Sequence, residues 1–110
     1  MLRLAASVER ASEHPLAAAI VAAASARGLH LEVPAAFVAA PGCGVSAQVG
    51  GRQVAVGTDA WFSGLGWDVS PFTSRAQQLR SEGQTVMFVA VDARVSGLLA
   101  VSDPLRVTAA

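Results

Sequence analysis

The spacing of the apolar residues changes from helical to strand-like between Gly28 and Phe37, and this change restricts the possible folds more than any other feature. Apolar residues recur at helical spacing up to Gly28, as in the run from Pro15 to Ala26. From Phe37 onward they alternate with polar or small residues, which is typical of strands with one buried face. Because helical and strand-like runs are segregated instead of alternating, we expect an α+β fold with antiparallel strands.

Two short helices are predicted at the start of the chain, joined by the sequence SEHP. The first spans residues 2–9. The second begins at Pro15, which suits the first helical position because its missing N–H would have no partner there, and it ends at Gly28. His14 is therefore expected at about the N-cap of the second helix, with Glu13 just before it.

Two hairpins are predicted in the alternating part. Gly50-Gly51 separates the runs 45–49 and 53–56, and a glycine pair between two alternating runs is a strong hairpin signal. A second turn is expected at 92–94, between two strongly apolar runs.

Two further helices are expected between the hairpins. Thr58 and Asp59 can cap a short helix that carries Trp61. The segment 70–83 begins with a serine suited to the N-cap, continues with proline and ends in glycine, which predicts a second helix.

Length and charge exclude several classes of function. The 110 residues correspond to one domain, and the eight arginines and eight acidic residues, with no lysine, form no basic stripe, so nucleic acid is not an expected partner. The apolar run 15–26 is shorter than the ~20 residues that a membrane helix needs. We therefore expect a soluble, monomeric chain. Its single cysteine excludes an internal disulfide.

The pair Glu13-His14 is the first candidate for chemistry, and it has two interpretations. A helix N-terminus favours acceptors and negative charge, so the pair can be a local cap. Alternatively, the imidazole stacks on a planar heterocycle while the carboxylate accepts from its exocyclic amine. The residues alone leave both open.

The sequence PGCGV, residues 41–45, is the second candidate. Two glycines one residue apart permit a turn or bulge between strands, or a close approach of the backbone to a ligand. A P-loop or dinucleotide fingerprint is excluded because a strand-like run, not a helix, follows the glycines.

Metal binding and catalysis have little support in the residues. A zinc or copper site needs several ligands, and the chain has one cysteine, Cys43, and two histidines. We therefore expect no metal site and no catalytic residue in this chain. A metal-sensing domain that uses Cys43 and the histidines is the alternative.

Taken in order, the motifs SEHPLAAAI, PGCGV, VAVGT and VSDPLR resemble those of the nucleotide-binding (N) domain of heavy-metal-transporting P-type ATPases. The resemblance covers nearly the entire chain, so residues 1–110 are expected to form one nucleotide-binding domain. The Gly-Cys-Gly form of the second motif favours a copper transporter over a zinc or cadmium one.

The resemblance implies roles for particular residues. His14 would orient the adenine ring of ATP, Glu13 would contact the adenine edge, and Gly42 and Gly44 would let the nucleotide lie close to the sheet. Thr58 stands where the family usually has asparagine, so the contact expected there is weaker. The complete set of expected ATP contacts is Glu13, His14, Gly42, Gly44, Val45, Gly57 and Thr58.

The resemblance also implies what surrounds this domain. The fold would be a twisted antiparallel sheet of about six strands flanked by helices. ATP, carrying Mg²⁺, or ADP would bind here, while the aspartate that becomes phosphorylated lies in a neighbouring domain with an Asp-Lys-Thr-Gly-Thr motif that this sequence lacks. The chain alone should not hydrolyse ATP.

The parent protein would be an integral membrane ATPase, with this domain on the cytoplasmic side of the plasma membrane. Phosphorylation and actuator domains would be its partners, and the ends of the chain would lie near the hinges to the phosphorylation domain. The alternative is an interaction module with the same fold that binds no nucleotide.

Overall fold

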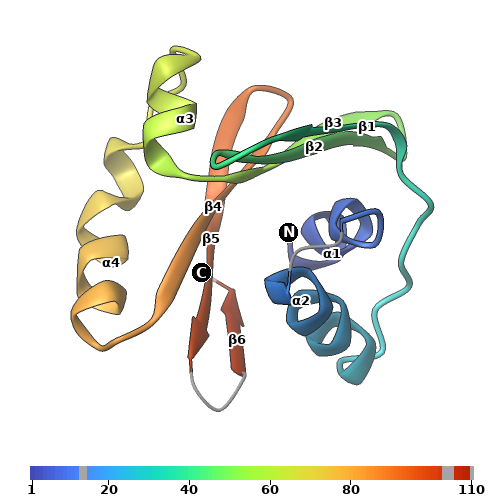
Figure 1. Ribbon diagram of the computed structural model, residues 1–110, viewed down its shortest axis with the longest axis horizontal. Helices are drawn as coiled ribbons and strands as arrows, with labels where there is room; N and C mark the ends of the chain where they lie inside the picture. The colour runs from blue at the N-terminus through green and yellow to red at the C-terminus, as the bar shows by residue number, and fades with distance from the viewer. Residues whose placement is uncertain (13–14, 103–105, 110) are drawn as a thin grey trace.

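The computed structural model describes residues 1–12, 15–102 and 106–109 of the chain. Within them, six antiparallel strands form one sheet whose strand order follows the order of the sequence (Figure 1). The strands are β1 (Ala35–Ala40), β2 (Gly44–Val49), β3 (Arg52–Gly57), β4 (Thr85–Val91), β5 (Arg94–Ser102) and β6 (Arg106–Ala109). The predicted α+β class and the six-stranded antiparallel sheet are confirmed.

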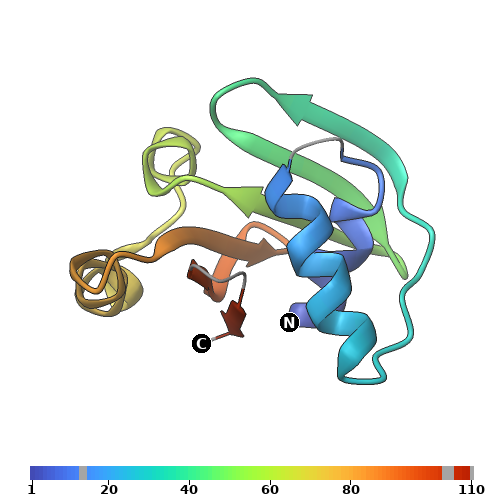
Figure 2. The ribbon, with the colours of Figure 1, turned by 60° about the horizontal axis from the view of Figure 1, so that its bottom comes forward.

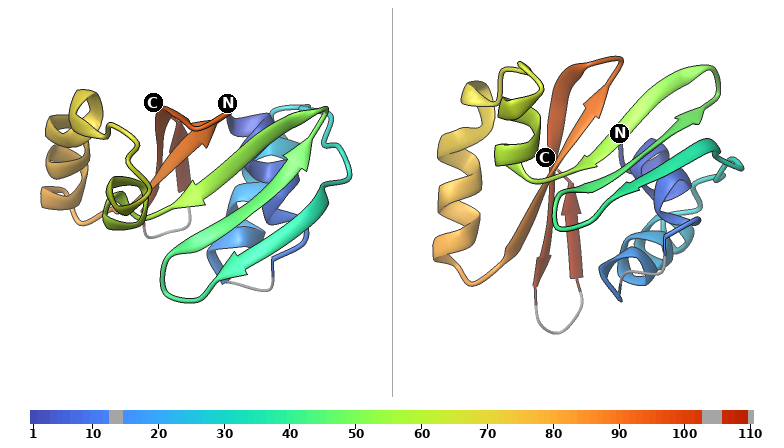
Figure 3. Two further views of the ribbon diagram at one scale, coloured as in Figure 1. Left: turned by 90° about the horizontal axis from the view of Figure 1, so that it is seen from above. Right: turned by 45° about the horizontal axis from the view of Figure 1, so that its top comes forward.

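Four helices in the described residues cover the two faces of the sheet. Figures 1 to 3 show two of them on one side and two on the other. The helices are α1 (Leu2–Glu9), α2 (Pro15–Ala26), α3 (Asp59–Gly64) and α4 (Ser70–Ser81). α1 packs against β2 and β3, whereas α4 packs against β4 and β5 on the opposite face. The two longest helices have 12 residues each, and no helix in the described part of the chain is long and apolar enough to cross a membrane.

Each face of the sheet has its own core, because successive residues of a strand point to opposite sides. Val54 and Val56 are buried against α1 and α2, while Ala55 between them belongs to the core under α3 and α4. Leu98 and Leu99 divide in the same way on β5. The alternation predicted from the sequence therefore produces two hydrophobic layers.

The predicted hairpins are confirmed. β2 and β3 pair in register around Gly50-Gly51, and β4 and β5 pair around a two-residue turn at Asp92 and Ala93. Both of these turn residues have positive φ, at 51° and 64°. Residues 106–109 at the end of the described chain form the edge strand β6 beside β5.

The N-terminus of α4 differs from the prediction. Ser70 does not cap the helix; Val69 occupies that position, and no side chain there makes a capping hydrogen bond. Instead, the carboxylate of Asp68 accepts hydrogen bonds from the Ser70 N–H at 3.0 Å and from its hydroxyl at 2.7 Å. These bonds hold the pKa of the Asp68 carboxyl below its usual value. The serine-proline pair at 70–71 favoured Ser70 as the cap, whereas the turn before the helix is formed by Asp68, two residues earlier.

Candidate functional site

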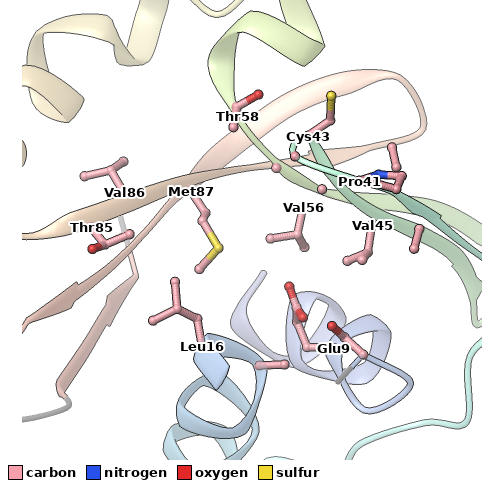
Figure 4. Close-up of a pocket in the computed structure, with 17 residues that line it drawn as sticks. Glu9, Leu16, Pro41, Cys43, Val45, Val56, Thr58, Thr85, Val86 and Met87 are labelled. Atoms are coloured by element: carbon pink, nitrogen blue, oxygen red, sulfur yellow. The ribbon is translucent and has the colours of Figure 1, made fainter. Parts of the chain in front are cut away.

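A cavity of about 520 Å³ lies between the sheet and the helices α1 and α2 (Figure 4). Four parts of the chain form its walls: Glu9, Ser12 and the start of α2, then residues 39–45, 56–58 and 85–87. The cavity has the size of a small-molecule site. Ser12 and Leu16, which line the cavity, flank positions 13–15 in the sequence. Glu13 and His14 fall outside the described part of the structure.

The interior of this cavity is mostly apolar. Figure 4 shows Leu16, Met87, Val45 and Val56 projecting into the space between the sheet and the helices, with the Glu9 carboxyl among them. Val45 and Val56 are cross-strand partners, so they present one continuous aliphatic surface. Apolar walls with few polar groups suit the faces of a flat heterocycle.

Glu9 is the polar group that the sequence analysis missed. It is 5% exposed, and burial raises the pKa of its carboxyl from an ordinary 4.5 to about 7, an effect partly offset by a hydrogen bond with the Ser12 side chain. The spacing could have revealed it, because Glu9 follows Leu2, Ala5 and Ala6 at i+7, i+4 and i+3 on the buried stripe of α1. A buried carboxyl is more informative than a buried leucine.

The Pro41-Gly42 turn closes one end of the cavity. The Cys43 N–H donates to the carbonyl of Ala40 at 2.9 Å, and Gly42 has φ +76°. Proline followed by a glycine with positive φ is the signature of a type II turn. Glycine is therefore required at position 42 by the backbone, and nothing lies within 4 Å of the place where its Cβ would be.

The glycines at 44 and 57 face each other across β2 and β3. A Cβ on Gly44 would meet the carbonyl oxygen of Val56 and would lie 2.6 Å from the Cα of Gly57, which is closer than real Cβ atoms come. The two strands thus approach each other closely here, and both glycines line the cavity with backbone. Their missing side chains make room on the opposite face, where α3 lies.

Thr58 caps α3, as predicted. Its Oγ1 accepts a hydrogen bond from the Trp61 N–H at 3.1 Å, and its own N–H donates to the carbonyl of Cys43 at 2.9 Å. Figure 4 shows the side chains of Thr58 and Cys43 pointing away from the cavity. Thr58 therefore borders the cavity mainly through its backbone, and the ligand contact expected from its hydroxyl stays a prediction.

The described residues bring five of the expected ATP contacts around one cavity: Gly42, Gly44, Val45, Gly57 and Thr58. Within residues 1–12, 15–102 and 106–109, no three His, Cys, Asp or Glu side chains gather in a way that could hold a metal ion. His30 is exposed, and Cys43 is half-buried.

The chain is similar to known proteins both in sequence and in structure. No protein-family model matches the chain. The copper-transporting ATPase 1 of Rhizobium meliloti is 46% identical over 108 residues, which are 98% of this chain and 13% of that protein. The chain thus spans about an eighth of the length of this relative.

The solved structures that are similar to this chain include an isolated domain and a whole transporter. The N-domain of the copper-transporting P-type ATPase HMA8 superposes with a TM-score of 0.75 at 31% identity, covering 92% of this chain and 87% of that one. A zinc-transporting P-type ATPase in its E2.Pi state gives a TM-score of 0.82 at 35% identity, over 96% of this chain and 17% of the transporter.

Proposed function

The chain belongs to the family of N-domains of heavy-metal-transporting P-type ATPases, and from this we propose that it binds ATP by the adenine base in the cavity between the sheet and α1–α2. In the whole transporter, which we infer to move copper, the domain presents the γ-phosphate to an aspartate of the phosphorylation domain. Phosphorylation and actuator domains are then its partners, and it lies on the cytoplasmic side of the plasma membrane.

One observation carries the proposal: among the described residues, Glu9 is the one buried carboxyl that lines this mostly apolar cavity of about 520 Å³. Adenine has two apolar faces and a polar edge with an exocyclic amine. The ring faces match the aliphatic surfaces of Val45, Val56 and Leu16, and the amine matches the carboxylate as an acceptor. A hydrogen bond of this kind to a charged group contributes about 1.5 to 3 kcal/mol.

The same carboxylate explains how the site would select its base. Guanine carries a carbonyl oxygen where adenine carries the amine, so an ionised Glu9 would face another acceptor. Leaving two buried acceptors opposed costs about 1 to 3 kcal/mol or more, which disfavours GTP. Glu13 and His14 follow the cavity residue Ser12 in the sequence, and they stay the predicted contacts to the adenine edge and ring.

The phosphates would project outward from this site. No arginine is among the described residues that line the cavity, and the chain has no lysine. Magnesium would therefore arrive on the phosphates of ATP and be held by them, without side-chain ligands from the described cavity residues. A site that holds mainly one base is expected to bind ATP at about 0.1 to 1 mM.

The test is a ¹⁵N-HSQC titration of the chain with ATP, ADP and GTP at pH about 8, where Glu9 is mostly ionised. We expect ATP and ADP to shift the amides of Gly42, Gly44 and Val45 alike, and GTP to shift them little. In the Glu9→Gln variant, whose amide can donate as well as accept, the preference for adenine should disappear.

Two outcomes of this titration would contradict the proposal. No shift at several times the expected dissociation constant would favour a non-nucleotide interaction module with this fold. Loss of adenine preference in Glu13→Gln but not in Glu9→Gln would move the base-reading carboxylate to position 13.

A further inference from the structure

At the Gly44–Gly57 pair of β2 and β3, the wall of the cavity consists of backbone alone, because neither residue has a side chain. Val45 and Val56 form the neighbouring pair and project into the cavity. Because successive residues alternate in direction, the Gly44–Gly57 pair faces the other side of the sheet.

The indole of Trp61 occupies that other side. A Cβ on Gly57 would lie 2.5 Å from Cε3 of Trp61 and 2.9 Å from its Cζ3, and a Cβ on Gly44 would lie 2.8 Å from Cζ3. The ring therefore rests directly on the bare backbone of both strands. Trp61 is half-buried and packs with Phe62, at a ring-centroid distance of 5.5 Å, in the core under α3 and α4.

Hydrogen bonds of the backbone join Trp61 to the turn that closes the cavity. The Trp61 N–H donates to Thr58 Oγ1 at 3.1 Å, and the Thr58 N–H donates to the Cys43 carbonyl at 2.9 Å. Residues 42–44, 57–58 and 61 thus form one connected unit, with the cavity on one side and the indole on the other.

Glycine-rich backbone is weakly constrained unless something packs on it, because glycine populates more backbone conformations than other residues. The wall formed by 42–45 and 56–58 contains three glycines. The affinity of a ligand for a site formed by backbone depends on how rigidly that backbone is kept in its binding conformation before the ligand arrives. Removing the ring would leave the wall without its packing partner on the far side.

We propose that Trp61 is a positioning residue for nucleotide binding: from the far face of the sheet, its indole holds the Gly44–Gly57 wall in the conformation that receives the base. This inference rests on the proposed function, because it concerns the same cavity. Trp61 itself contacts no nucleotide; it acts through the two glycines.

The test compares Trp61→Ala with the matched variant Trp67→Ala. Trp67 is also half-buried and packs on the same Phe62, at a centroid distance of 5.1 Å. None of its atoms is among the three nearest to a Cβ placed on Gly44 or on Gly57. The ATP dissociation constant is measured by calorimetry at low temperature, with folding checked by circular dichroism. We expect Trp61→Ala to weaken ATP binding about tenfold, Trp61→Phe to recover most of it, and Trp67→Ala to change it less than about twofold.

Equal weakening in the two alanine variants would overturn the inference, because it would indicate a general loss of core packing. Unchanged affinity in folded Trp61→Ala would overturn it as well. A wild-type chain that binds no ATP contradicts the proposed function and this inference together, whereas normal wild-type binding with an insensitive Trp61 contradicts the inference alone.

A second measurement covers the case in which Trp61→Ala does not fold. The chain has two tryptophans, so Trp67→Phe leaves Trp61 as the single site for 5-fluorotryptophan. We expect the ¹⁹F resonance of Trp61 to shift with ATP along the same saturation curve as the amides of Gly44 and Gly57. An unmoved resonance at saturation would overturn the inference.

Discussion

Glu9 makes the stability of this chain depend on pH. Its carboxyl is buried, which raises its pKa from 4.5 to about 7. Below pH 4.5 it is protonated in both the folded and the unfolded chain. Between 4.5 and about 7 the unfolded chain releases the proton first, so the free energy of unfolding should fall as the pH rises, by roughly 1 to 3 kcal/mol in total, and then level off. Denaturant unfolding across this pH range measures the effect.

The control for this prediction is a pair of amide substitutions. Glu9→Gln should remove most of the decline between pH 4.5 and about 7, because the amide does not titrate there. Glu82→Gln changes an exposed carboxyl and should leave the decline in place. A decline that survives in Glu9→Gln would assign it to another group.

The two residues of the β4–β5 turn, Asp92 and Ala93, are only partly suited to its backbone conformation. Asp92 is tied to β3, because its N–H donates to the Gln53 carbonyl at 2.7 Å and its carboxylate accepts from the Gln53 N–H at 3.0 Å. Ala93 has φ 64°, a left-handed conformation that favours glycine. We expect Ala93→Gly to raise the free energy of unfolding by about 0.5 to 1 kcal/mol.

Chemical denaturation of Ala93→Gly tests this expectation, and Ala18→Gly serves as its counterpart. Ala18 is exposed in the helix α2, where glycine should cost about 1 kcal/mol. If both substitutions destabilise the chain, the left-handed turn does not strain Ala93.

At the scale of the whole molecule, the proposed function makes this chain a domain that binds ATP without cleaving it. One cavity lies between the sheet and α1–α2, and the sequence has no Asp-Lys-Thr-Gly-Thr motif. We expect the purified chain to release no phosphate from Mg-ATP above a protein-free blank. Binding should still raise the melting temperature, since ATP at about ten times its dissociation constant stabilises the folded state by about 1.4 kcal/mol. Stoichiometric phosphate release would contradict the first expectation.

Local patterns in the sequence were sufficient for most of the elements. These patterns predicted the two N-terminal helices on either side of SEHP, the Gly50-Gly51 hairpin, the turn at 92–94 and the Thr58 cap. Each of these features depends on residues close together in the chain. The motif spacing also sufficed to identify the family. The N-cap of α4 was predicted at Ser70 but lies at Val69, one residue earlier. The error arose because two residues suited to capping, Asp68 and Ser70, lie within three positions of each other.

The arrangement of the site depended on contacts between distant segments. The motifs predicted seven contact residues, and five of them lie in the described part of the chain. The face of the sheet toward which Gly44 and Gly57 leave room is decided by the tertiary structure, which places Trp61 against both glycines on the far side. Glu9 belongs to the buried stripe of α1, but that stripe meets a cavity only because β2, β3 and α2 fold around its end. Periodicity determines which side chains share a face; the packing of one element on another determines what that face meets.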